Sequence, residues 1–130
     1  MYNREILERF KNPENAGGLR GANGTGKAGD VECGEVIKIY ILVDENEVIE
    51  TAKFKAYGGV LTIAGCDIAC ELLEGGTLED ALKITNNDIL ERFENVPQNK
   101  EYIASLIEDA IKNAIEDYYK KKEKEEKKNK

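Results

Sequence analysis

The three cysteines of this 130-residue chain are its main candidates for chemistry, and all of them lie within residues 30–70. Cys33 is followed by Gly34 and Glu35, between a glycine-rich stretch and an expected strand, so its thiol should be accessible. A thiolate beside a carboxylate can ligate iron or zinc, or can accept a persulfide sulfur. The alternative interpretation is a loop cysteine without a chemical role.

The spacing of Cys66 and Cys70 would allow both of their thiols to act as further metal ligands. Residues four positions apart share one face of a helix, so both thiols could reach one metal ion. Free cysteine is, however, among the most buried residue types, and the surrounding segment is apolar, so packing in the core is the alternative. Asp67 is either a solvated helix residue or an oxygen ligand.

Composition excludes several other classes of function. The chain has no histidine, which excludes histidine-based acid–base catalysis and metal sites that contain histidine. No apolar run approaches the roughly 20 residues of a membrane helix, the first residues do not form a secretory signal, and three cysteines suit free thiols, so we expect a cytoplasmic protein. The formal net charge of −7 argues against a nucleic acid partner.

The first half of the chain predicts one helix and a small sheet. Residues 3–10 place apolar side chains on one helical face, and Asn3 can cap that helix. Glycine-rich residues 17–29 are expected to be mobile or irregular, although residues 27–32 could add a third strand. Alternating apolar residues predict strands at 36–43 and 48–56, joined by a hairpin turn.

Helices dominate the second half, and we expect them at residues 60–74, 78–84, 87–93 and 102–119. The first is apolar nearly all round, so it should be buried. Strands followed by helices predict an α+β fold, in which a small three-stranded antiparallel sheet packs against several helices, including a long C-terminal one. Residues 1–119 should form one domain. Residues 120–130, with seven lysines and three glutamates, should form a frayed tail.

A series of short motifs also resembles a known family. The motifs are Met1-Tyr2, the run Lys11-Asn12-Pro13-x-Asn15-x-Gly17, Cys33-Gly34-Glu35, the strand that ends at Tyr57, and Glu108-Asp109-Ala110-Ile111-Lys112. In this order they resemble the U-type iron–sulfur cluster assembly scaffolds, the IscU and NifU N-terminal family. The resemblance runs from Tyr2 to about Tyr119.

The resemblance implies a fold, a cargo and partners. Members of the family assemble a [2Fe–2S] cluster on three cysteines, helped by a histidine and an aspartate. They take sulfur from a cysteine desulfurase and pass the cluster to acceptor apo-proteins with the help of an Hsp70-type chaperone. Cys33 matches the first of these cysteines, and Glu35 stands where the aspartate usually is.

The chain departs from the family pattern at three places. Gly59 stands where the second cysteine is expected, and Tyr102 and Ile103 stand where a histidine–cysteine pair is expected. The chaperone-recognition stretch keeps only Pro97 and Lys100. A [2Fe–2S] cluster usually takes four protein ligands, whereas Cys33 and Glu35 supply at most two. Cys66 lies seven residues beyond Gly59, about 10 Å along a helix, and cannot simply replace the missing thiolate.

Our first hypothesis is therefore a divergent scaffold or carrier rather than an enzyme, which binds iron or a [2Fe–2S] cluster. Its ligands would be the thiolates of Cys33, Cys66 and Cys70, together with an oxygen of Glu35 or Asp67, and it could be a homo-oligomer. Two alternatives stay open. One is a degenerate paralogue that binds the desulfurase without a cluster. The other is a sulfurtransferase that accepts a persulfide on Cys33, with zinc bound nearby.

Overall fold

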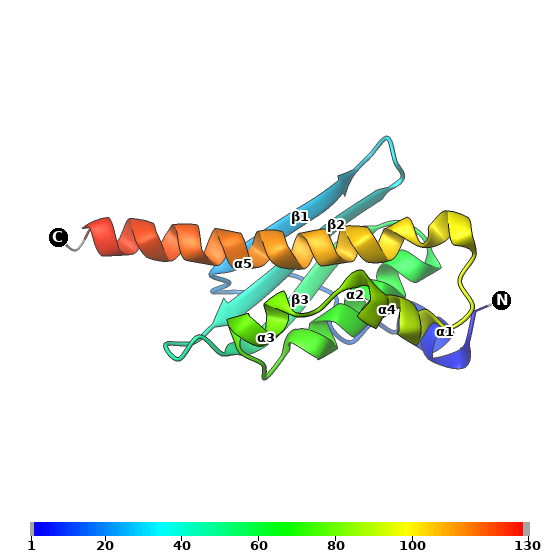
Figure 1. The fold of residues 1–130 in the computed structure, drawn as a ribbon, viewed down its shortest axis with the longest axis horizontal. Helices are drawn as coiled ribbons and strands as arrows, with labels where there is room; N and C mark the ends of the chain where they lie inside the picture. The colour runs from blue at the N-terminus through cyan, green and yellow to red at the C-terminus, as the bar shows by residue number, and fades with distance from the viewer. Residues whose placement is uncertain (1, 129–130) are drawn as a thin grey trace.

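The fold is a three-stranded antiparallel sheet packed against helices, as seen in a computed structural model that describes residues 2–128 (Figure 1). The expected α+β class is confirmed, and the sheet has the order β1-β2-β3. The helices and strands in chain order are α1 (Arg4–Lys11), β1 (Gly24–Asp30), β2 (Glu35–Val43), β3 (Ile49–Tyr57), α2 (Val60–Leu73), α3 (Leu78–Leu82), α4 (Asn86–Phe93), a short 3-10 turn (Gln98–Lys100) and α5 (Tyr102–Lys128).

Strand β1 corrects the expectation of a mobile or irregular segment for residues 24–29, and it provides the third strand that the sequence placed at residues 27–32. It pairs with β2 over its whole length, from Gly24 opposite Ile41 to Asp30 opposite Glu35. Gly24 and Gly26 face α5, and a Cβ atom at Gly24 would lie 2.6 Å from the carbonyl oxygen of Ala114. The glycines therefore serve close packing of a strand against a helix backbone, a role that composition alone does not distinguish from flexibility.

The core lies between one face of the sheet and helices α2 and α5. Ile37, Ile39 and Ile41 of β2 are buried on this face, as their alternation in the sequence predicts. Phe54 of β3 pairs with Ile39 and packs in the same layer. Helix α5 crosses β1 and β2 in Figure 1, while α2 packs against β3.

Helix α5 is longer than the sequence predicts. The expected fraying beyond residue 119 is wrong for residues 120–128, which continue the helix; residues 129–130 lie outside the described part of the chain. The physical reason is a series of ion pairs four residues apart, namely Lys120–Glu116, Lys121–Asp117 and Lys127–Glu123, each of which supports helical structure. Within residues 2–128, no helix combines the length and apolar character needed to cross a membrane.

We expect Gly26→Ala to destabilise the protein strongly. The new Cβ would collide with the backbone of α5 at Ala110 and Ala114, and backbone cannot move aside as a flexible side chain can. Overpacking of this kind costs about 3 kcal/mol, which urea denaturation would measure. Gly18→Ala is the matched control, because its Cβ would make only ordinary contacts with Lys55. Equal stability of the two variants would contradict this account of β1.

Candidate functional site

The tip of the β1–β2 hairpin presents Cys33 to solvent, as the sequence predicts. The hairpin projects from the body of the molecule at the top of Figure 1, and Cys33 is exposed. Its backbone N–H donates to a carboxylate oxygen of Asp30 at 2.8 Å, and the Asp30 N–H approaches the Cys33 sulfur at 3.5 Å. Gly34 completes the turn at φ +87°, a left-handed conformation that favours glycine. The thiol is thus held at a fixed place on an accessible loop.

Glu35 lies two residues after Cys33, and its side chain turns inward. It is nine-tenths buried, and one of its carboxylate oxygens accepts a hydrogen bond of 2.7 Å from the hydroxyl of Tyr102. Tyr102 is the first residue of α5, so this bond joins the start of that helix to the hairpin. The hydrogen bond to Glu35 is the main cause that raises the pKa of the Tyr102 phenol, which therefore stays a donor near neutral pH.

The glycine turn before α2 lies beside this hairpin. Val36 pairs with Tyr57, so the residues that follow Tyr57 leave the sheet next to the beginning of β2. Gly59 is the N-cap of α2, and a Cβ placed on it would meet nothing within 4 Å. The Cys33 loop and the glycine turn that opens α2 therefore lie at the same end of the sheet.

Cys66 and Cys70 do not join Cys33. Both thiols are fully buried in the hydrophobic core, whereas Cys33 is exposed at the hairpin tip. Burial raises the pKa of both thiols, and the neighbouring Asp67 charge acts in the same direction. The expectation that these thiols turn toward Cys33 does not hold here, because α2 is packed on nearly every side and its small thiols fill the interior.

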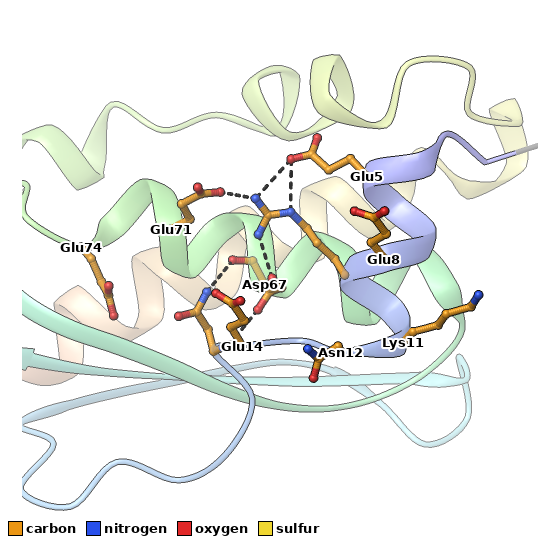
Figure 2. Close-up of a pocket in the computed structure, with 10 residues that line it drawn as sticks. Glu5, Glu8, Lys11, Asn12, Glu14, Asp67, Glu71 and Glu74 are labelled. Carbon is orange, nitrogen blue, oxygen red and sulfur yellow. Dashed lines mark hydrogen bonds and ion pairs between the residues drawn. The ribbon is translucent and has the colours of Figure 1, made fainter.

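Asp67 is buried rather than solvated, and it is held by an arginine from α1. The Arg9 guanidinium donates to Asp67 at 2.7 Å and to Glu5 at 3.1 Å, and it also pairs with Glu71. Arg92 of α4 pairs with Glu5 at 2.5 Å and lowers the pKa of that carboxyl group. Figure 2 shows Asp67 and Glu71 on α2 beneath Glu5 on α1. These five side chains tie three helices together.

The remaining oxygen of Asp67 is also used. The backbone N–H of Asn15 donates to it at 2.9 Å, and the Asn15 side chain donates to the Asp67 carbonyl at 3.2 Å. Because both oxygens of this carboxylate already accept hydrogen bonds, Asp67 has a structural role in this conformation. It also lines a surface pocket of about 690 Å³ whose rim is largely acidic, made by Glu5, Glu8, Arg9, Lys11, Asn12, Glu14, Asn15, Asp67, Glu71 and Glu74.

Few side chains that could bind a metal ion lie near the hairpin tip. Within residues 2–128, no three histidine, cysteine, aspartate or glutamate side chains are grouped so that they could hold a metal ion. At this end of the molecule Cys33 presents an accessible thiol, and Glu35 contributes a carboxylate that is largely buried. Tyr102 adds a hydrogen-bond donor to Glu35.

Two long-range contacts could not be predicted from the residues alone. The Tyr102–Glu35 hydrogen bond joins residues 67 positions apart, and its only signal was that Tyr102 aligned with a family ligand position. The Arg9–Asp67 pair spans 58 positions. The sequence feature that could have indicated this pair is the single aspartate in the buried part of an apolar helix, because a buried charge needs a partner of opposite charge.

Comparison with known proteins defines the class of this chain. The model of the family described as "NifU-like N terminal domain" matches residues 1–125. An Archaeoglobus fulgidus protein named "Iron-sulfur cluster assembly scaffold protein IscU 1" is 38% identical over 121 residues, which cover 93% of this chain and 78% of that protein. A Haemophilus influenzae protein with the name "Iron-sulfur cluster assembly scaffold protein IscU" is 42% identical over 120 residues, covering 90% and 94%.

The solved structures agree on the fold. The N-terminal part of a nitrogen-fixing NifU-like protein from Brucella abortus superposes with a TM-score of 0.72 at 20% identity, covering 91% of this chain and 94% of that one. The chain therefore belongs to the NifU-like N-terminal domain family, as its motifs predict.

We expect thiol labelling to separate the three cysteines. In the native protein an alkylating reagent should modify Cys33 within minutes, while Cys66 and Cys70 react only on unfolding, because burial protects them and keeps them protonated. Mass spectrometry of native and denatured samples would then show one and three adducts. Three adducts on the native protein would contradict the assignment of the α2 thiols to the core.

We expect Arg9→Met to destabilise the protein by about 3 kcal/mol, because it leaves the buried carboxylate of Asp67 without its cation. Arg4→Met on the same helix is the matched control. Arg4 pairs with Glu8 in full solvent exposure, and such pairs contribute about 0.5 kcal/mol. Urea denaturation of the two variants should therefore differ clearly. Similar midpoints would show that the Asp67 pair does not hold α1 on α2.

Proposed function

We propose that this protein is an iron–sulfur cluster assembly scaffold, which holds iron or a [2Fe–2S] cluster and passes it on. Membership of the NifU-like N-terminal domain family over nearly the whole chain supports this, since its relatives carry the name of such scaffolds. The observation that carries the proposal is the position of Cys33. Its accessible thiol lies at the tip of the β1–β2 hairpin, two residues before Glu35, whose buried carboxylate is held by Tyr102.

Cys33 is the first ligand of the cargo in this proposal. Its thiol loses a proton to solvent, and the resulting thiolate binds iron. Glu35 supplies a carboxylate oxygen, while Tyr102 holds the other oxygen through its hydrogen bond and so orients the ligand. Cys66, Cys70 and Asp67 stabilise the fold instead, since their side chains are committed to the core and to Arg9.

Two ligands from one chain leave a [2Fe–2S] cluster half-ligated. The remaining ligands come from another molecule, and a second copy that contributes its own Cys33 and Glu35 would complete the set of four. Val31 lies two residues before Cys33, and Tyr57 lies opposite Val36 in the sheet. With 79% and 68% of their surface exposed, they offer apolar surface at this end of the sheet for such contact. Weak protein ligation suits a carrier, because the cargo must leave for an acceptor.

The partners follow from the same role. A cysteine desulfurase would deliver sulfur to Cys33, and acceptor apo-proteins would receive the cluster. The segment with Pro97 and Lys100 is the place where an Hsp70-type chaperone would bind. The chain acts as a carrier and not as an enzyme, and an accessible free thiol suits the reducing cytoplasm.

Anaerobic reconstitution with ferric iron and sulfide tests the proposal. The wild type should take up iron and acid-labile sulfide with a visible absorption spectrum, and should then transfer the cluster to an apo-ferredoxin. Cys33→Ala should lose the chromophore, whereas Cys66→Ala should keep it, because Cys66 is a core residue. A colourless wild type, or colour that persists without Cys33, would overturn the proposed function.

Tyr102→Phe should weaken the binding of iron or the cluster without removing a ligand. The variant loses the hydrogen bond that orients Glu35, and losing such a supporting contact weakens metal binding by about tenfold. Competition with an iron chelator would measure this, beside Tyr119→Phe as a matched control further along the same helix. Equal retention by the two variants would exclude a positioning role for Tyr102.

A further inference from the structure

The face of the sheet opposite the helices carries four lysines. Side chains alternate along a strand, so those between the buried positions turn away from the core. The register places Lys27 opposite Lys38, and Lys38 opposite Lys55, which makes a row across all three strands. Lys53 occupies the outward position next to Lys55 on β3, opposite Tyr40 on β2. We call Lys27, Lys38 and Lys55, all exposed, the lysine row.

The positive charges of the lysine row are not balanced by carboxylates within the described part of the chain. None of its three ammonium groups forms an ion pair with a carboxylate of residues 2–128, and Lys38 instead lies 5.6 Å from the centre of the Tyr40 ring. No acidic residue occupies the other outward positions that pair across the strands, which are Thr25, Gly29, Val36, Tyr40, Leu42, Thr51, Lys53 and Tyr57. This face is therefore basic, although the whole chain carries a net charge of −7.

This arrangement works against stability. Like charges directly opposite one another on adjacent strands repel, and the central Lys38 faces one such neighbour on each side. Threonine or glutamine would satisfy an exposed strand position without this repulsion. A binding role accounts for lysine at all three positions.

We propose that the lysine row binds an acidic helical segment of a partner protein. Adjacent strands lie about 4.8 Å apart, so the three lysines span about 10 Å. Carboxylates four residues apart on a helix are separated by about 5–6 Å, which matches the lysine spacing. Tyr40 and the exposed Tyr57 add aromatic surface on the same face, as protein interfaces favour.

Charge favours a compact acidic protein segment over an extended polyanion. The lysines of this face lie on the three strands, and apart from the lysine-rich end of α5 the rest of the molecule carries an excess of negative charge. A nucleic acid or an anionic membrane would extend beyond the lysines and meet repelling carboxylates. An acidic helix of a few turns is short enough to contact the lysines without reaching these carboxylates. The proposal is independent of the proposed function, because the hairpin-tip thiol is not part of this face.

A designed peptide tests the proposal on the full chain. The probe is an alanine-based helix with three glutamates four residues apart, and its control has glutamines at the same positions. Titration at low ionic strength, followed by amide NMR shifts, should show binding of the glutamate peptide with shifts at the lysine row. The triple variant Lys27→Gln, Lys38→Gln and Lys55→Gln should bind at least tenfold more weakly. The control Lys83→Gln, Lys124→Gln and Lys128→Gln removes the same charge elsewhere and should bind normally.

Other outcomes would overturn it. Equal binding of the glutamate and glutamine peptides, or unchanged binding by the lysine-row variant, would remove this face as a site. Tighter binding of single-stranded RNA or phosphatidylserine vesicles, lost in the same variant, would replace the protein segment with a polyanion. Thermal unfolding adds a second readout. Lys38→Gln should melt at the same or a higher temperature than wild type, and a clear drop would indicate that Lys38 serves the fold.

Discussion

The close packing of α5 on the glycines of β1 determines where the functional groups lie. Gly24 and Gly26 leave no side chain between the strand and the helix, so the two backbones come together near Ala110 and Ala114. Because the helix is rigid, fixing its middle against β1 also fixes the position of its N-terminal end. That end carries Tyr102, whose hydroxyl reaches Glu35. A contact near the middle of α5 thus positions the hydrogen bond at the hairpin tip.

The burial of charge on α2 is a second constraint on the architecture. Most of this helix is apolar and enclosed, and Asp67 brings a carboxylate into the same environment. An unpaired buried charge is strongly unfavourable, so the Arg9 partner makes α1 an obligatory part of the fold. The same arrangement excludes Asp67 from metal binding in this conformation, and it keeps Cys66 and Cys70 inside the core.

The proposed site is small. Its thiol, Cys33, is exposed on a projecting hairpin, whereas its carboxylate, Glu35, is largely buried and bonded to Tyr102. The fold is shared with a solved NifU-like structure at a TM-score of 0.72. Its stability comes from the sheet, the enclosed α2 and the α5 packing rather than from the exposed Cys33.

The sequence by itself determined the features that depend on local pattern. Alternation in β2, the apolar character of α2 and the exposed position of Cys33 were all predictable, because each follows from neighbouring residues. Only the tertiary structure decided whether Cys66 and Cys70 face a site or the core, and which cation meets Asp67. It also revealed the pairing of Tyr102 with Glu35 and the alignment of Lys27, Lys38 and Lys55. These are long-range contacts, set by strand register and helix packing rather than by any local preference.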